Sequence, residues 1–427
     1  MNENFLQIFF WLLVCYPLIG AVGWTVGGVY YRYFYRGRNR KFEPIAVQDQ
    51  PMISIMIPAH NEEVMIEETV EYLMNDMNYE NYEVLVCDDG SYDMTSEILA
   101  SLAFRYPNLR VLHVEKNKGK AHAFNIGTSF CKGEFVLSND ADTVPEPDAL
   151  TKYMSYFMDP AYQNCAAVTA NMDVQNRSFL LEKSQTVEFS SIVGIIKRSQ
   201  LGFLGAMYAY SGANTMYRKA AIYDAGLFRQ DRATEDISIA WDHQLNGWQA
   251  LFDPDIMFYM NVPSTLEMLY KQRKRWAKGG IEVYFTNFRK VFKHPIRHIS
   301  QVIMMIDQTG SILWSFLYFF GLFYMLFRFF WLTLTQQHLA LLHYVDMIFV
   351  FYSFMAIVGS WQLFAALIMD NHAKKLKYLF FAPIYMLWYW QVNTLTIITT
   401  FVPAIKAVLG LQGEGTWVSP TRTKMKE

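Results

Sequence analysis

The stretch EFVLSNDAD, residues 134–142, combines a short apolar run with two carboxylates. The residues FVLS suit a buried β-strand, and Asp140 and Asp142 follow one residue apart. Strand alternation would point both carboxylates to the same side, where they would repel each other without a cation between them. Mg²⁺ and Mn²⁺ bind one or two carboxylates together with substrate phosphates. The stretch therefore predicts a strand that ends at a divalent metal site; an Asp-rich turn is the alternative.

Similar β-rich runs occur on both sides of this stretch. They are ISIMIPAH (53–60), YEVLVCDDG (82–90), LRVLHVE (109–115) and CAAVTANM (165–172). Helical patterns separate them: EEVMIEETVEYLM (62–74), MTSEILASLAF (94–104) and KAHAFNIGTSF (120–130). The alternation predicts an α/β domain with a mostly parallel sheet. In such sheets the ligand site gathers at the carboxyl ends of the strands.

The ends of the other strands also carry polar residues. Glu62 follows the first strand, and Asp88 and Asp89 end the second, where a carboxylate could accept from a base N–H or a ribose hydroxyl. A turn with a helix N-cap is the alternative for the second strand end. Gly119 and Lys120 begin a helix after the third strand and suit a phosphate, although a solvated basic turn fits equally well.

Two further motifs lie nearer the C-terminus. In ATED, Glu235 and Asp236 begin a helix; they suit either a general base or acids that stabilise the helix start. In QRKRW, residues 272–276, two arginines can bind phosphate in a planar fork, and Trp276 offers a flat face to a sugar ring. A membrane-surface anchor is the alternative for QRKRW, but an anchor has no reason to follow a metal pair.

Composition excludes some classes of function. The 427 residues are 52% hydrophobic and 18% charged, with a formal net charge of −2, so nothing indicates a nucleic-acid partner. No pair among the four cysteines has metal-ligand spacing, which indicates reduced, buried thiols. Residues 5–31 carry no charge and are long enough to cross a bilayer. The cations that follow, between Arg32 and Lys41, place residue 42 onward in the cytoplasm.

Further apolar blocks follow the α/β region. Residues 310–332 and 345–369 are predicted to cross the membrane outward and back. Lys374, Lys375 and Lys377 then suit the cytoplasmic side. Pro383 and Pro403 are expected to interrupt residues 379–409, which also have basic residues on both flanks. Both features favour an interfacial or re-entrant segment over a third crossing after the α/β region.

Two charged residues lie inside the proposed spans. Arg328 is near the outer end of one span and Asp346 near the outer end of the next. Intramembrane charges usually pair or line a polar path. We therefore expect these two side chains to approach each other or to line an exit path.

The order of NEE, DDGS, DAD, TED and QRKRW resembles the processive, membrane-embedded glycosyltransferases of family 2, which include cellulose, chitin and hyaluronan synthases. Within the family, VEFSSIVGIIKRSQ (187–200) and the tail TWVSP with Arg422 look most like the bacterial poly-β-1,6-N-acetylglucosamine synthases. The tail has SPTR where the family usually has SPDR. The resemblance implies a GT-A type nucleotide-sugar domain inserted between transmembrane helices.

The resemblance also implies roles for individual residues. Asp236, with Glu235 beside it, would be the catalytic base, and Asp140 and Asp142 would hold Mg²⁺ or Mn²⁺. The remaining residues implied to bind substrate are Glu62, Asp88, Asp89, Lys120, Asp140, Gln272, Arg273, Arg275, Trp276, Trp417 and Arg422. Trp417 and Arg422 would belong to a gating loop that folds over the nucleotide.

Together these observations predict six regions. They are an N-terminal transmembrane helix with a basic flank (1–41), a cytoplasmic glycosyltransferase domain (42–281), interfacial helices (282–309), two transmembrane helices (310–369), an interfacial or re-entrant segment (370–411) and a cytoplasmic tail (412–427). The chain would be a multi-pass protein of the bacterial cytoplasmic membrane.

The implied reaction is processive, inverting transfer of N-acetylglucosamine from UDP-N-acetylglucosamine to a growing β-linked, β-1,6 polysaccharide that is exported for biofilm. The implied partners are the UDP-sugar, the polysaccharide acceptor, the lipid bilayer and a small membrane subunit. Synthesis of another β-linked polymer, of the chitin, hyaluronan or cellulose type, and non-processive transfer to a lipid phosphate are the alternatives. A non-catalytic membrane scaffold is disfavoured, because a scaffold has no use for Asp140 beside Asp142.

Overall fold

The computed structural model describes residues 3–35, 42–370 and 373–411. Its α/β part is built on one eight-stranded sheet with the order β3-β2-β1-β4-β7-β6-β8-β5. The strands are β1 (Ile53–Ala59), β2 (Tyr82–Asp89), β3 (Leu109–Val114), β4 (Phe135–Asn139), β5 (Thr143–Pro145), β6 (Cys165–Val174), β7 (Asn214–Arg218) and β8 (Gln249–Met260). β7 is antiparallel to β4 and β6, and β5 is antiparallel to β8. The other neighbouring pairs are parallel, so the prediction of a mostly parallel sheet is confirmed.

The five strands expected from the sequence are all present, and their burial explains why they were recognisable. β1 and β4 are buried along their whole length, and β2 nearly so, because helices cover this central part of the sheet. The helices around the sheet are α2 (Ile66–Asn75), α3 (Thr95–Arg105), α4 (Lys120–Phe130), α5 (Ala149–Phe157), α8 (Lys219–Asp224) and α9 (Glu235–Leu245). The carboxyl ends of β1, β2 and β4 therefore lie at one edge of the sheet, as expected.

A long helical segment joins the sheet to the rest of the molecule. It consists of α6 (Leu180–Phe189), a π-helical stretch η4 (Ser190–Ile195) and α7 (Ile196–Leu204), and most of its side chains are buried, including many polar ones. α10 (Leu266–Lys293) carries the QRKRW motif. π-Helical insertions are rare and often occur at functional sites.

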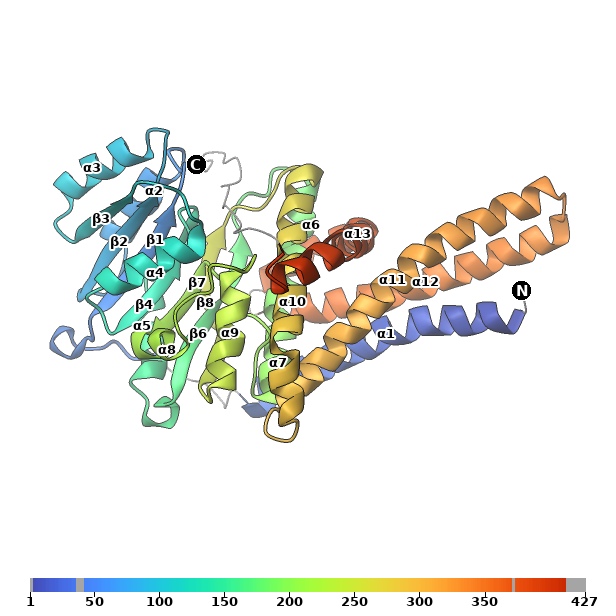
Figure 1. The fold of residues 1–427 in the computed structure, drawn as a ribbon, viewed down its shortest axis with the longest axis horizontal. Helices are drawn as coiled ribbons and strands as arrows, with labels where there is room; N and C mark the ends of the chain where they lie inside the picture. Colours follow the sequence, from blue (N-terminus) through green and yellow to red (C-terminus); the bar gives the residue numbers. More distant parts are fainter. Residues whose placement is uncertain (1–2, 36–41, 371–372, 412–427) are drawn as a thin grey trace.

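Three helices extend together away from the sheet (Figure 1). They are α1 (Glu3–Tyr30), which continues as a π-turn (Tyr31–Tyr35), α11 (Ile299–Leu334) and α12 (His338–Met369). Within the described residues these are the three helices long and apolar enough to cross a membrane, with spans at Ile8–Tyr35, Ile299–Leu334 and His338–Met369. The start of α1 and the turn between α11 and α12 lie at the same far end (Figure 1).

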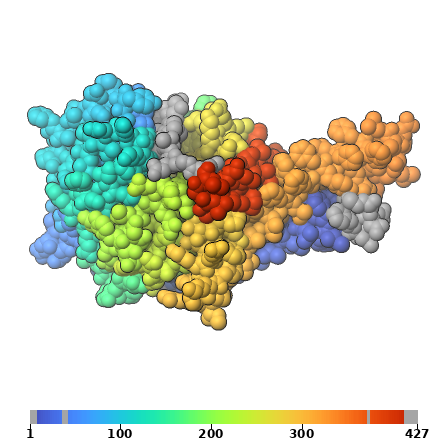
Figure 2. Space-filling model, viewed as in Figure 1, coloured from blue at the N-terminus to red at the C-terminus, as the bar shows by residue number. Residues whose placement is uncertain are grey.

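The last apolar block forms one helix, α13 (Ala382–Val408), after a 3-10 stretch (Ala373–Phe381). The expectation that prolines interrupt this block is wrong. Pro383 lies in the first turn, where a helix needs no N–H donor, and Pro403 is accommodated inside the helix. In Figure 2, α13 (red) lies at the junction between the sheet domain and the three long helices.

The expected approach of Arg328 to Asp346 is not found. The Arg328 guanidinium lies 5.4 Å from the ring centroid of Tyr344 and donates to the Tyr324 hydroxyl at 3.3 Å. Asp346 is exposed, and no ion pair joins it to Arg328 in the part of the chain that the structure describes. A cation over an aromatic ring is a stable alternative to a carboxylate partner.

Candidate active site

The carboxylates at the end of β2 are buried and strongly hydrogen-bonded. Asp88 accepts the Ser91 N–H at 3.1 Å, and its other oxygen lies 3.1 Å from His113 Nδ1. One oxygen of Asp89 accepts the N–H groups of Lys118 (3.1 Å) and Gly119 (2.9 Å). The N–H groups that the sequence suggested for a phosphate thus bind Asp89 in this structure.

The other oxygen of Asp89 is left for a different partner. Asp89 Oδ1 and His122 Nδ1 lie 3.6 Å apart, buried, and neither has a hydrogen bond. Buried polar atoms without hydrogen bonds are rare and call for an explanation such as a missing ligand. Gly90 is required beside them, because its φ is +69° and an added Cβ would lie 2.8 Å from the Asn117 nitrogen. Glu62 is also buried, at the turn that follows β1.

A charged cluster joins the end of β4 to the start of α9. The Lys120 ammonium, itself buried, lies 2.6 Å from Asp140 and 3.3 Å from Glu235. It also donates to the carbonyl of Gly212 at 3.3 Å, while the Gly212 N–H donates to Asp236 at 3.0 Å. Residues far apart in sequence are thus gathered around one glycine.

Gly212 was missed by the sequence reasoning. An added Cβ would lie 3.1 Å from Lys120 Nζ, 3.2 Å from Glu235 Oε1 and 3.4 Å from Asp236 Oδ2. The close neighbours of Gly212 are side chains from the starts of α4 and α9, and such a tertiary contact leaves no local pattern in the sequence.

Asp236 has an environment that suits a base near neutral pH. Burial and the neighbouring Glu235 raise the pKa of its carboxyl from 3.8 to about 6, against the opposing influence of Lys120 and Arg275. A general base is most effective when its pKa lies near the working pH. Arg275 is close enough to Asp236 for its charge to lower the pKa of the carboxyl. No hydrogen bond joins the two side chains in the described part of the structure.

The carboxylates of the DAD stretch do not follow strand alternation. β4 ends at Asn139, so residues 140–142 form a turn and the alternation argument does not apply. Asp140 is about one-quarter exposed and pairs with Lys120, whereas Asp142 is buried. No group of three metal-ligating side chains is present among the described residues. Two carboxylates are nonetheless sufficient where substrate phosphates and water complete the shell of Mg²⁺ or Mn²⁺.

The QRKRW residues differ from the expected phosphate clamp. The Arg273 fork binds Glu188 of α6, with Nε 2.9 Å and Nη2 2.8 Å from the two carboxylate oxygens. Arg273 also donates to Gln272, and its guanidinium carbon lies 4.1 Å from the Trp276 ring centroid. The fork of Arg273 is therefore occupied by protein, and Arg275 remains as the arginine next to the Asp236 cluster.

A second buried ion cluster ties α12 to the sheet. Asp370, which ends α12, accepts from Asn171 and Ser190 at 2.9 Å and from Lys375 at 2.7 Å. Burial would raise the pKa of Asp370, but Lys375 and Arg198 together lower it to about 2. Lys375 is buried within this cluster, and the cytoplasmic side expected for it stays a prediction. Trp417 and Arg422 lie outside the described residues.

Comparison with known proteins points to one family. The model described as Glycosyl transferase family 2 matches residues 54–226. Poly-beta-1,6-N-acetyl-D-glucosamine synthase of Staphylococcus epidermidis is 32% identical over 417 residues, which cover 96% of this chain and 97% of that protein. The protein of the same name from Staphylococcus aureus (strain COL) is 33% identical over 423 residues, covering 97% and 98% of the two chains.

One solved structure supports the fold. Mannosyltransferase PcManGT from Pyrobaculum calidifontis, in complex with GDP-Man and Mn2+, aligns with a TM-score of 0.55 and 19% identity. The alignment covers 86% of this chain and 99% of that chain. At this identity the shared property is the fold, and the expected GT-A type of α/β domain is confirmed.

Proposed function

The chain belongs to glycosyl transferase family 2, and on this premise we propose that it is a processive poly-β-1,6-N-acetylglucosamine synthase of a bacterial cytoplasmic membrane. The observation that carries the proposal is the cluster of Lys120, Asp140, Glu235 and Asp236 around Gly212. This cluster lies within a chain that matches named synthases over nearly its whole length.

The donor is UDP-N-acetylglucosamine, held at the carboxyl ends of β1, β2 and β4. The unsatisfied atoms of Asp89 and His122 would receive polar atoms of the nucleoside. The backbone carbonyl of Glu62 accepts the N–H groups of the turn that follows it, and the Asp88 side chain accepts the Ser91 N–H. Both residues therefore fix the loops around the nucleotide. Trp417 and Arg422 would close over the nucleotide and exclude water, which limits hydrolysis of the donor.

Asp140 and Asp142 would hold Mg²⁺ or Mn²⁺ together with the donor diphosphate. When bound, the metal supplies positive charge that neutralises the charge developing on the leaving UDP. Lys120 forms ion pairs with both Asp140 and Glu235. It therefore holds the proposed metal ligand Asp140 close to the residue that precedes the proposed base. Arg275 adds a second positive charge next to this cluster.

Asp236 acts as the general base. It takes a proton from the acceptor hydroxyl while that oxygen attacks the anomeric carbon, and the bond from this carbon to the UDP oxygen breaks. One displacement inverts the α-linked donor to a β-linkage. General-base assistance contributes about 10²–10⁴ in rate. The Gly212 N–H fixes the orientation of the carboxylate.

The growing end of the polymer occupies the acceptor site near Trp276, and α1, α11 and α12 carry the product across the membrane. The catalytic domain lies in the cytoplasm, because the cations after α1 follow the positive-inside rule. A small membrane subunit is the expected protein partner.

Purified full-length protein in lipid nanodiscs tests the proposal. UDP release and product length are measured with UDP-N-acetylglucosamine, UDP-glucose or UDP-glucuronate as the donor. We expect Mg²⁺- or Mn²⁺-dependent release with the first donor and a long polymer that a β-1,6-specific N-acetylglucosaminidase degrades. A single sugar transferred to lipid phosphate, or a polymer from another donor, would replace this proposal with the corresponding alternative.

A further inference from the structure

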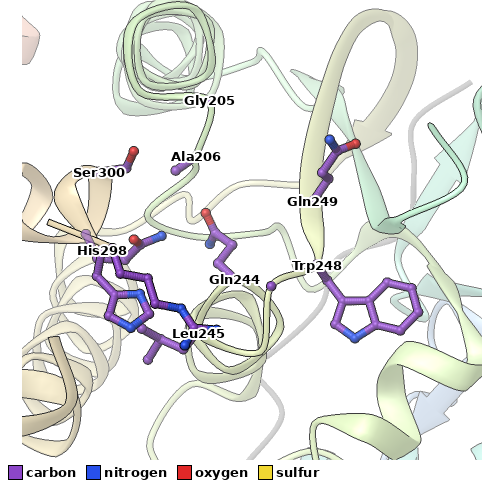
Figure 3. Close-up of a pocket in the computed structure, with 11 residues that line it drawn as sticks. Gly205, Ala206, Gln244, Leu245, Trp248, Gln249, His298 and Ser300 are labelled. Atoms are coloured by element: carbon purple, nitrogen blue, oxygen red, sulfur yellow. The ribbon is translucent and has the colours of Figure 1, made fainter. Parts of the chain in front are cut away.

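A cavity is lined by residues at the C-terminal end of α9 and at the start of α11 (Figure 3). Its volume is about 220 Å³, and its walls come from the end of α9, the following turn, the start of α11 and the small residues Gly205 and Ala206. Asp236 begins α9, whereas Gln244 and Leu245 at its other end line the cavity. The cavity is therefore separate from the proposed glycosyl transfer site.

Part of the wall is already fixed by internal hydrogen bonds. The Gln244 amide binds both backbone groups of Met207, and the Trp248 indole donates to Asp224 at 2.8 Å. The Ser300 hydroxyl donates to the carbonyl of Leu204. These groups shape the cavity and have little left to offer to a ligand.

Other donors in the wall have no partner. The Gln301 side chain is 7% exposed and lines the cavity, yet its amide forms no hydrogen bond within the described residues. Arg297 and His298 also line the cavity, and Arg297 forms no ion pair within the same residues. Because Gln301 lines the cavity, the N–H groups of its amide are available to a ligand that accepts hydrogen bonds.

The backbone adds further donors at the same place. The first N–H groups of a helix have no carbonyl of the same helix to bind. In α11 the Val302 N–H donates to the His298 carbonyl at 2.9 Å, and the N–H groups before it, at the very start of the helix, have no such partner among the described residues. The N-terminus of this long helix therefore presents free N–H groups beside Arg297 and His298. This set of donors is suited to a phosphate group.

The surface next to the cavity indicates where the phosphate comes from. Ile299, Ile303 and Ile306 are 55%, 44% and 61% exposed and form one strip along the start of α11. Phe288 and Phe292 are exposed at the end of α10, close to the cations Arg289, Lys290 and Lys293. Basic and aromatic residues beside an apolar strip are typical of the membrane–water interface.

We propose that this cavity binds the phosphate of an anionic membrane phospholipid, with Arg297, His298 and the Gln301 amide as ligands. The acyl chains would lie along the isoleucine strip of α11. A free phosphate would use the same donors but would leave the strip uncovered, and a zwitterionic lipid would bring a choline cation next to Arg297. The cations of the surrounding corner attract anionic lipids in general, so the specific contribution comes from the residues inside the cavity.

Full-length protein in detergent is titrated with dioctanoyl phosphatidylglycerol, dioctanoyl phosphatidylcholine or inorganic phosphate. Binding is measured by the thermal unfolding midpoint and by lipid retained in native mass spectrometry. We expect saturable binding of phosphatidylglycerol that is weakened about tenfold or more in Arg297→Gln and in Gln301→Leu, since each removes hydrogen bonds to a charged group. Lys293→Gln, which removes an exposed cation outside the cavity, should change the affinity less than about twofold.

Three results would overturn the proposal. Equal weakening in Lys293→Gln and Arg297→Gln would mean diffuse attraction by the basic corner. Equal binding of the two lipids would remove the selectivity for an anion. Full competition by inorganic phosphate at the same concentration as the lipid would assign the cavity to a soluble anion.

Discussion

Glu188 holds Arg273 by two parallel hydrogen bonds, at 2.9 and 2.8 Å, and the same guanidinium lies 4.1 Å from the ring centroid of Trp276. The carboxylate is almost fully buried, and the pair joins residues 85 positions apart. A bidentate pair of this kind fixes the guanidinium plane and therefore the position of the indole beside it. Glu188 is thus a positioning residue for the proposed acceptor site.

The first prediction concerns this pair. Glu188→Gln should lower the rate with short N-acetylglucosamine oligomers as acceptors and raise their KM, while the KM for UDP-N-acetylglucosamine stays unchanged. Breaking a buried ion pair on one side costs about 3–5 kcal/mol of stability, so thermal unfolding is measured in parallel. The double variant Glu188→Gln/Arg273→Gln should be more stable than either single variant, because it leaves no unpaired charge.

Lys271→Gln is the matched control, since Lys271 is exposed on the same helix and pairs with the exposed Glu267. It should behave like the wild type in both measurements. If Glu188→Gln changed the KM for donor and acceptor equally, the pair would support the fold of the whole domain and not the acceptor site.

The second prediction concerns the base. With a pKa of about 6, Asp236 loses its proton-accepting form as the pH falls through 6, so the rate should decline on that side. Lys120 is one of the groups that lower the pKa of Asp236, so Lys120→Met should move this decline to higher pH. Initial rates of UDP release between pH 5 and 8 measure the shift.

Asp236→Asn separates a catalytic role from a purely structural one. The N-cap of α9 is Thr234, and Asp236 accepts the N–H groups of Gly212 and Ile237 at the start of the helix. Asparagine can still accept these N–H groups, so a structural role predicts little change, whereas the catalytic role predicts a loss of about 10²–10⁴ in rate with donor binding retained. Near-normal turnover in this variant would contradict the assignment.

The site shows which features a sequence can reveal. Strands β1, β2 and β4 were recognisable because buried apolar runs ended at turn residues, and the same runs located Asp89 and Asp140. The partner of Arg273 was not recognisable, because tertiary contacts over 85 residues leave no local pattern. The turn at residues 140–142 also defeated the alternation argument, since the period of two holds only within a strand.

The third prediction concerns the metal. Asp142→Asn should abolish polymer synthesis and weaken Mn²⁺ binding measured by electron paramagnetic resonance in the presence of UDP-N-acetylglucosamine. Chelation of wild-type protein should have the same effect on synthesis. Asp148→Asn is the control, because Asp148 is half-exposed and pairs with Lys152 away from the cluster. Full activity of wild-type protein in excess chelator would exclude the metal role.

The fourth prediction concerns the ion cluster at the end of α12. Asp370 has a pKa of about 2 in the folded protein, so its charge stabilises the fold above pH 4 and this contribution is lost as the pH falls towards 2. Asp370→Asn leaves Lys375 and Arg198 without their shared partner and should cost about 3–5 kcal/mol at neutral pH. Asp346→Asn, at an exposed position, should leave the thermal unfolding midpoint in detergent unchanged. Equal midpoints for the two variants would show that the cluster does not hold α12 to the sheet.

The last prediction concerns the path of α13, whose two ends both lie near the sheet domain. Near its start, Ala382 and Tyr385 pack in one cluster with Val187 of α6. Near its end, the Phe401 ring lies 6.0 Å from that of Phe285 in α10, and the Thr399 hydroxyl lies 3.1 Å from that of Tyr270.

If α13 crossed the membrane fully, its end would lie on the far side, away from α10. We therefore expect α13 to lie along the inner face of the membrane and residue 411 to be cytoplasmic. An impermeant maleimide applied to intact cells should label a cysteine at Leu339, next to the turn between α11 and α12, and should not label one at Leu411. Both positions are exposed, at 87% and 70%, so a missing label reports on sidedness and not on burial.

The native cysteines make this experiment simple. Burial raises the pKa of Cys87, Cys131 and Cys165 to about 12, so their thiols stay protonated and unreactive. Cys15 is the exposed one and is replaced by serine in the parent protein. Breaking the cells should then expose the cysteine at Leu411 to the reagent. If it were labelled before the cells are broken, α13 would cross the membrane, and the tail after residue 411 could not close over a cytoplasmic nucleotide site.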